Sequence, residues 1–165
     1  MQEAIKKKLI EAYDAHSDAI YRHCYFRVFK KTRAEELVQD TFMKTWEYMK
    51  KGKQIDNIRA FLYKVANNLI IDESRKKKEQ SLDELIEQNI LAEPSYREEK
   101  IFEHNIILAE VKEKIKNLSE EDQNLITLRY LDDLDPKDIS AVTGDSANNV
   151  SVKLNRALTR LRQLI

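Results

Sequence analysis

Apolar positions recur every three or four residues along most of this 165-residue chain, a spacing typical of amphipathic helices. The pattern predicts one or two helices over residues 3–31, one over 34–51 and one from about 56 or 57 to 78. It resumes over 96–117 and continues in three further helices to the end of the chain. Strands joined by tight turns use glycine and proline heavily, so the presence of only 2 of each also favours an all-α fold.

Several helix starts are marked by residues that cap helices. Thr32 and Glu35 form a Thr-x-x-Glu capping box, which predicts that a helix begins there. Ser119, Asp135 and Ser146 predict the starts of the last three helices. Serine and aspartate suit this position because their side chains accept hydrogen bonds from the free N–H groups of the first turn.

Charge is segregated along the chain although the formal net charge is zero. Residues 1–78 carry a net charge of +7, residues 79–145 carry −11 and residues 146–165 carry +4. Residues 79–96 are acidic and lack a sustained helical pattern. We therefore expect two helical domains, 1–78 and 97–165, joined by an acidic linker. Two basic ends indicate two surfaces that face a polyanion, although either cluster alone is better explained as an ordinary solvated face.

Catalytic and metal-binding groups are sparse. Cys24 is the single cysteine, which excludes an internal disulfide and fits a reducing compartment. His16, His23 and His104 are scattered without metal-ligand spacing. The pair Asp132–Asp133 is expected to lie in a solvated loop. No apolar run approaches the roughly 20 residues of a membrane span, and together these features predict a cytoplasmic protein that is not an enzyme and has no cofactor.

Residues 135–163 have the anatomy of a helix-turn-helix: a short helix, a turn containing Gly144 and a longer second helix. In such a unit the first residues of the second helix reach base edges, and later basic residues lie near phosphates. An ordinary helical hairpin with a basic solvated face fits the spacing equally well. The candidate DNA-binding residues are Asn148, Asn149, Ser151, Val152, Lys153, Asn155, Arg156 and Arg160.

The C-terminal segment carries, in this order, Leu118-Ser119, Leu128-Arg129-Tyr130, Ile139-Ser140, Gly144, Val150, Lys153-Leu154 and Arg156-Ala157. In these positions it resembles the promoter-binding domain of bacterial RNA polymerase sigma factors, and most of all the extracytoplasmic-function group. The helix AEELVQDTFMKTWEYM, residues 34–49, is a sharper match to the signature helix of the same family. Residues 58–78 resemble the family segment that follows, an aromatic-bearing helix that ends in basic residues.

The resemblance implies a binding role for helix 34–49, which in the family docks on the clamp helices of the largest subunit of the polymerase. By position it assigns polymerase contact to Glu35, Gln39, Asp40, Lys44 and Glu47. The implied partners are core RNA polymerase, including the flap of its second-largest subunit, promoter DNA and an inhibitory anti-sigma factor.

For residues 58–78 the resemblance implies recognition of the −10 element and of unpaired bases. Aromatic rings stack on splayed bases, amides read base edges and basic residues follow phosphates. Phe61 also lies on the core stripe, so packing is its expected role, whereas Tyr63 and Asn68 lie off that stripe and are expected to bind DNA. The full implied set is Arg59, Phe61, Tyr63, Lys64, Asn68, Arg75, Lys76, Lys77 and Lys78.

For the last helix the resemblance implies binding to the −35 element, but residues 148–152 depart from the family pattern. The family often has Gly-Thr before Val150 and a basic residue after it, where this chain has Asn148-Asn149 and Ser151. The −35 preference therefore stays open. Two alternatives remain: a stand-alone helix-turn-helix regulator, which does not need helix 34–49, and a sigma-like interaction module with weakened −35 binding.

Overall fold

A computed structural model describes residues 1–78 and 106–165, and these residues form helices without any strand. The elements are α1 (Gln2–Val28), α2 (Lys31–Lys50), α3 (Ile58–Lys78), α6 (Ile106–Ile115), α7 (Glu120–Ile126), the π-helical turn η1 (Thr127–Leu131), α8 (Pro136–Thr143) and α9 (Ala147–Leu164). The all-α prediction is confirmed. The predicted linker 79–96 and the first part of the helix predicted over 96–117 lie outside the described residues. Within the described ranges, no helix combines the length and apolar character needed to cross a membrane.

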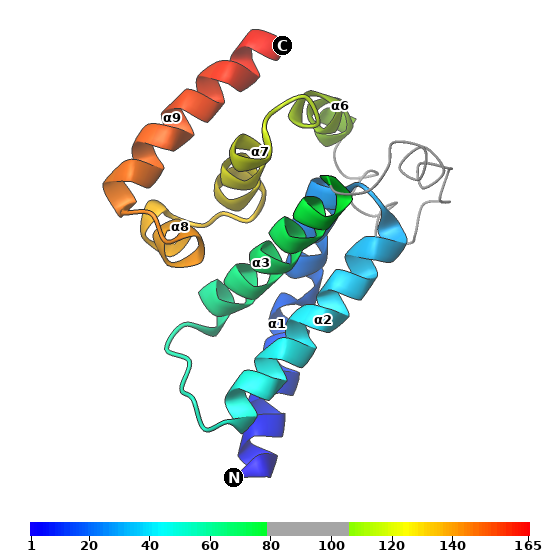
Figure 1. Cartoon of the computed structure of the whole chain (residues 1–165), viewed down its shortest axis with the longest axis vertical. Helices are drawn as coiled ribbons and strands as arrows, with labels where there is room; N and C mark the ends of the chain where they lie inside the picture. Colours follow the sequence, from blue (N-terminus) through cyan, green and yellow to red (C-terminus); the bar gives the residue numbers. More distant parts are fainter. Residues whose placement is uncertain (79–105) are drawn as a thin grey trace.

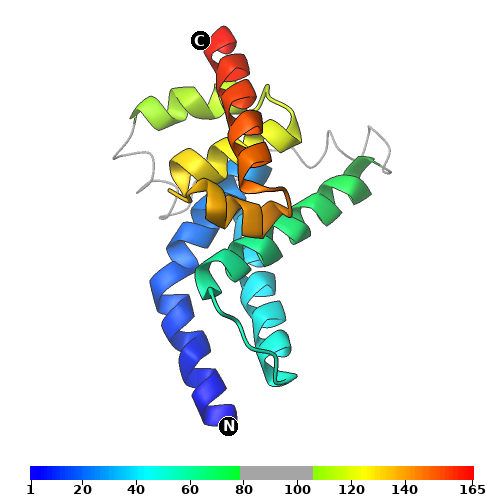
Figure 2. The same ribbon diagram turned by 90° about the vertical axis from the view of Figure 1, so that its left-hand side faces the viewer.

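Helices α1 and α2 form an antiparallel hairpin, and α3 packs against both of them (Figure 1). The first helix is continuous and ends where Phe29 adopts a left-handed conformation, with φ 56°. The N–H of Phe29 donates to the carbonyl oxygen of Tyr25 at 2.8 Å, which closes the last turn of α1. The two termini of the chain lie at opposite ends of the molecule (Figures 1 and 2).

The predicted caps of the C-terminal helices are present. Ser119 Oγ accepts from the N–H of Asp122 at 3.2 Å and begins α7. Asp135 Oδ1 accepts from the N–H of Asp138 at 2.8 Å and begins α8. Helix α8 ends at Gly144, whose φ of 87° suits glycine because a Cβ atom would strain this conformation. The helix-turn-helix predicted from the sequence is therefore formed by α8 and α9.

The predicted capping box at the start of α2 is wrong. Helix α2 begins at Lys31, and Lys30 occupies the capping position without any side-chain hydrogen bond. The N–H of Ala34 already donates to the carbonyl oxygen of Lys30 at 2.9 Å, so Thr32 lies inside the first turn. The helix starts early because Arg33, in its first turn, bonds to Glu36 at 2.8 Å and to Glu73 of α3 at 2.5 Å.

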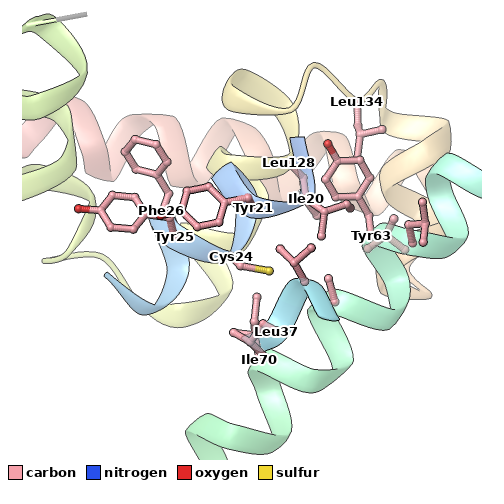
Figure 3. Packing of buried hydrophobic residues seen from close by; sticks show 14 of the residues in the cluster. Ile20, Tyr21, Cys24, Tyr25, Phe26, Leu37, Tyr63, Ile70, Leu128 and Leu134 are labelled. Carbon is pink, nitrogen blue, oxygen red and sulfur yellow. The ribbon is translucent and has the colours of Figure 1, made fainter. Parts of the chain in front are cut away.

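The C-terminal helices pack directly on the N-terminal three. Helix α8 lies against α3, and η1 lies against α1 (Figure 2). One hydrophobic cluster therefore spans both parts: Ile20 and Tyr63 share it with Leu128 and Leu134 (Figure 3). Ile139 belongs to the same cluster. The two helical parts predicted from the sequence share one core in this structure.

The cap of α9 gives a test of the local structure. Ser146 Oγ accepts from the N–H of Asn149 at 3.1 Å, so we expect Ser146→Ala to lower the free energy of unfolding by about 1 kcal/mol. Urea unfolding followed by circular dichroism would measure the change. Ser151→Ala is the matched control, since Ser151 lies exposed inside α9 and alanine favours helix interiors. An equal loss of stability in both variants would show that Ser146 is not a cap.

Candidate nucleic-acid interface

The polar side of α2 is accessible to a partner. Gln39, Asp40, Lys44 and Glu47 are exposed and Glu35 is half-buried. The opposite side packs into the core through Ala34, Leu37, Val38, Thr41, Phe42, Thr45 and Met49. Met43 is 60% exposed in the same stretch, an apolar contact point that the sequence pattern did not single out. The helix thus combines a buried apolar side with a compact polar surface that contains one exposed apolar residue.

The residues of α3 that were predicted to bind DNA do not share one exposed face. Lys64, Asn68, Arg75 and Lys76 are exposed, whereas Arg59, Phe61 and Lys77 are half-buried; Lys78 ends the helix. Phe61 packs on Tyr48 with 4.7 Å between ring centroids, in line with a packing role. The Lys77 Nζ atom lies 4.0 Å from a carboxylate oxygen of Glu73. The accessible candidates on α3 are therefore one amide, Asn68, with basic residues on either side of it in the sequence.

Tyr63 is buried instead of lying off the core as predicted. Its side chain is 1% exposed, and its ring stands edge-on to that of His23, with 5.4 Å between centroids. Burial, and then the charge of Asp132, raise the pKa of Tyr63 above its usual value. The prediction failed because a second set of helices covers this side of α3. Any contact between Tyr63 and DNA therefore requires the C-terminal helices to move away.

Helix α9 presents its predicted residues to solvent. Asn148, Asn149, Ser151, Val152, Asn155, Arg156 and Arg160 are exposed, and Lys153 is half-buried. The other side of α9 is anchored by Val150, Leu154 and Ala157, which are buried. Val152 is 38% exposed, and an apolar side chain in a major groove can contact the methyl group of thymine. The surface is therefore rich in amides, which can pair with adenine, and moderately basic.

Two of the basic side chains on α9 already form ion pairs with carboxylates. Lys153 Nζ lies 2.7 Å from Glu121 and 3.1 Å from Asp145, and hydrogen bonds to both carboxylates raise the pKa of Lys153. Arg160 donates to both oxygens of Asp122, at 3.0 and 2.8 Å. Among the described residues, Arg156 has no ion-pair partner. The positive potential of this face is therefore weaker than the sequence suggests.

Asp132 is a residue that sequence reasoning misjudged. Asp133 does lie in solvent, with its side chain 95% exposed, but the side chain of Asp132 is fully buried. An oxygen of Asp132 lies 2.8 Å from Nδ1 of His23, 109 residues earlier in the chain. The Arg59 guanidinium donates to the backbone carbonyl of Asp132 at 2.6 Å. Two adjacent aspartates look alike in sequence, and only the long-range partners of Asp132 distinguish them.

Arg27 also joins the two parts of the chain. Its Nη1 donates to Asn67 Oδ1 at 3.0 Å and to Asn124 Oδ1 at 2.8 Å. Burial lowers the pKa of Arg27 to about 10, which still leaves the side chain charged at neutral pH. Arg27 lines a cavity of about 310 Å³ between the two parts, and Asn68 and Glu120 line it as well. No local signal marked Arg27, because both of its partners lie on other helices.

Cys24 is part of the core and not of a reactive site. It is 0% exposed, and burial followed by the charge of Asp132 raises the pKa of its thiol to about 12. In the described parts of the chain, no group of three His, Cys, Asp or Glu side chains could hold a metal ion. What the described residues do offer is three exposed polar surfaces, on α2, α3 and α9.

Two family models match the chain. The model described as Sigma-70 region 2 matches residues 12–80, and the model described as Sigma-70, region 4 matches residues 108–161. The first match covers most of α1 with all of α2 and α3. The second covers most of the helices from α6 to α9. The two matches therefore coincide with the two helical parts of the structure.

Curated relatives match nearly the whole chain. The ECF RNA polymerase sigma factor SigM of Bacillus subtilis is 29% identical over 163 residues, which cover 93% of each chain. The ECF RNA polymerase sigma factor BldN of Streptomyces coelicolor is 28% identical over 162 residues and 93% of this chain. This chain spans 58% of the length of BldN.

Solved structures share the fold. The sigma factor RpoE in complex with the anti-sigma factor NepR, from Bartonella quintana, superposes with a TM-score of 0.72 at 21% identity over 96% of each chain. CnrH in complex with the cytosolic domain of CnrY gives a TM-score of 0.71 at 20% identity, over 96% of this chain and 88% of that one. Both likenesses extend across the N-terminal and C-terminal helices.

The buried thiol provides a test of the core beside these surfaces. At pH 8, a pKa of about 12 leaves on the order of one thiol in ten thousand ionised. We expect Cys24 in the folded chain to react with Ellman's reagent about a hundredfold or more slowly than in urea. The control is a Cys24→Ala chain with Ser151→Cys, whose exposed thiol should react at the rate of a free cysteine. Rapid labelling of Cys24 without urea would contradict the burial.

Proposed function

Because the chain belongs to the extracytoplasmic-function group of sigma-70 factors, we propose that it is a dissociable initiation factor that directs core RNA polymerase to specific promoters. A role in promoter recognition by RNA polymerase follows from membership of the family. The observation that carries the fuller proposal is the joint presence of two surfaces in one chain. These are the exposed polar side of α2 and the exposed polar side of α9. A protein that binds only DNA would need only the second surface.

Helix α2 is the proposed docking surface for polymerase. Gln39, Asp40, Lys44 and Glu47 form an accessible polar row, and Met43 adds an apolar contact. A row of this kind suits a helical partner, because a partner helix can bury the apolar residue while polar groups at the rim set its orientation. We propose that this row binds the clamp helices of the largest subunit, and that residues 97–165 also contact the flap of the second-largest subunit.

The two helical parts are proposed to bind separate promoter elements, with residues 1–78 at the −10 element and residues 97–165 at the −35 element. Asn68 and the basic end of α3 suit unpaired bases and their phosphates, and this binding would assist promoter melting. Asn148, Asn149 and Asn155 offer amides to the major groove from α9. Residues 79–96 are proposed to link the two.

A sigma-like interaction module is the second candidate function. It is favoured by the ion pairs that engage Lys153 and Arg160, because these leave the face of α9 with less charge for phosphates. The solved relatives RpoE and CnrH are described in complex with NepR and with the cytosolic domain of CnrY, the first of these an anti-sigma factor. We propose an anti-sigma partner for this chain as well, and a place of action in the cytoplasm, where RNA polymerase works.

Run-off transcription tests the proposed function. Purified core polymerase with this chain should yield new transcripts from genomic promoter fragments, and Lys44→Glu should reduce both transcription and polymerase pull-down about tenfold or more. The reversal replaces an attractive charge on α2 by a repulsive one. Lys7→Glu is the control, since Lys7 is an exposed lysine on α1, outside both α2 and residues 97–165. No polymerase binding and no new transcript from the unaltered chain would refute the proposal.

The salt dependence of duplex binding tests the face of α9. Arg156→Ala should reduce the slope of log affinity against log salt concentration by about 1, because one phosphate contact is lost. Lys153→Ala should change that slope less, because two carboxylates within 3.1 Å already offset the charge of Lys153. Fluorescence anisotropy with a labelled promoter duplex would measure both slopes. Equal changes in the two variants would show that DNA displaces the carboxylates from Lys153.

A further inference from the structure

We propose that the cavity between the two helical parts is a binding site for a small α-amino acid with an aliphatic side chain. The cavity measures about 310 Å³, and residues of α1, α3, α7 and α8 line it together with the turn after α8. Ligand pockets typically measure about 300 to 1,000 Å³, so a cavity of this size suits a small molecule. The proposal does not rest on the proposed function, because the free chain would bind the ligand whether or not it directs transcription.

Arg27 gives the cavity a cationic group with donors to spare. Its Nη1 makes both of its hydrogen bonds, to the amide oxygens of Asn67 at 3.0 Å and Asn124 at 2.8 Å. A guanidinium has five N–H donors, and those on Nε and Nη2 have no partner among the residues that the structure describes. Burial lowers the pKa of Arg27 to about 10, so the group is charged at neutral pH. A ligand carboxylate would accept two parallel bonds from it.

Two buried amides add further donors beside Arg27. Asn67 and Asn124 are 2% and 7% exposed, and both line the cavity. Because Arg27 donates to both amide oxygens, the orientation of each amide is fixed and its NH₂ group lies on the side away from the guanidinium. Within residues 1–78 and 106–165, neither NH₂ group has a hydrogen-bond partner. Buried donors are normally satisfied, and a carboxylate held in the cavity would satisfy these.

Carboxylates line the same cavity, so an anion alone is not its best ligand. The three are Glu120, Glu121 and Asp145. Glu121 and Asp145 lie 2.7 and 3.1 Å from Lys153 Nζ, and Glu120 accepts from the hydroxyl of Ser74. An ionised carboxylate has about four acceptor sites, so these bonds leave capacity for an ammonium group. Because the lining carboxylates outnumber the lining guanidinium, the cavity favours a ligand that also carries a positive charge.

Apolar side chains complete the lining of the cavity. Leu125 and Val142 are buried, and Ile71 is 38% exposed. Apolar walls with a few polar groups are typical of small-molecule sites, and these walls would cover an aliphatic side chain. An aliphatic acid would leave the lining carboxylates unused, and an aliphatic amine would leave the guanidinium unused. An aliphatic α-amino acid carries the carboxylate, the ammonium group and the apolar chain on one carbon atom, and so matches all three parts of the lining.

Isothermal titration calorimetry of the full chain tests the class of ligand. The probes are L-leucine, isoamylamine, which lacks the carboxylate, and isocaproate, which lacks the ammonium group. L-Leucine should bind about tenfold or more tightly than either analogue, because each analogue leaves groups of the site unpaired. It should also raise the melting temperature, since a ligand that binds only the folded chain stabilises it. Equal binding of the three probes, or no saturable binding of L-leucine at millimolar concentration, would overturn the proposal.

Variants test where the ligand binds. Glu120→Gln should weaken L-leucine about tenfold and bring its affinity close to that of isocaproate, because the ammonium loses a charged partner. Glutamine keeps an oxygen that can accept from Ser74. Glu113→Gln is the matched control, since Glu113 is an exposed glutamate on α6 that does not line the cavity. Arg27→Gln should weaken L-leucine and isocaproate alike, with folding checked by circular dichroism. If that variant does not fold, Glu120→Gln decides, and an unchanged preference for L-leucine there would refute the site.

Discussion

Helix α3 is buried on two sides, and the rest of the described structure depends on this double packing. Leu62, Ala66 and Ile70 belong to the side that completes the core with α1 and α2, whereas Tyr63 and Asn67 belong to the side that the C-terminal helices close. A helix that supplies two faces to one continuous core ties the stability of both parts together. Polar side chains of α3 that this packing buries need hydrogen-bond partners from other helices, and Arg27 of α1 provides one for Asn67.

Features that depend on residues within one helical turn could be predicted from the sequence. The caps at Ser119, Asp135 and Ser146, and the glycine that ends α8, are local interactions with characteristic residues. The capping box at Thr32 failed although its sequence pattern is present, because the cap lies two residues earlier, at Lys30, and Arg33 in the first turn has partners in Glu36 and Glu73. A local signal decides a helix start only when no tertiary contact competes with it.

Features that depend on distant partners could not be predicted. The periodicity of α3 identifies the side that faces its nearest helices, but it does not show that Tyr63 meets a second set of helices. Asp132 illustrates the limit further, since its neighbour Asp133 has the same side chain and lies in solvent. The family resemblance assigned the polymerase-binding candidates to α2 and the DNA-binding candidates to α3 and α9, and these assignments stay predictions. The resemblance did not indicate how the two helical parts pack together, and this packing decides which candidate residues are exposed.

The chain has equal numbers of basic and acidic residues, 29 of each, and some of the acidic residues pair with the cations of α9. Glu121 and Asp145 hold Lys153, and Asp122 holds Arg160, so carboxylates occupy cations that DNA phosphates would otherwise attract. A phosphate must therefore displace a carboxylate before it gains from either contact. This competition weakens sequence-independent binding, which depends on charge alone, more than binding at a site that also supplies base contacts. A chain built in this way gives up general affinity for nucleic acid and depends more strongly on finding the correct sequence.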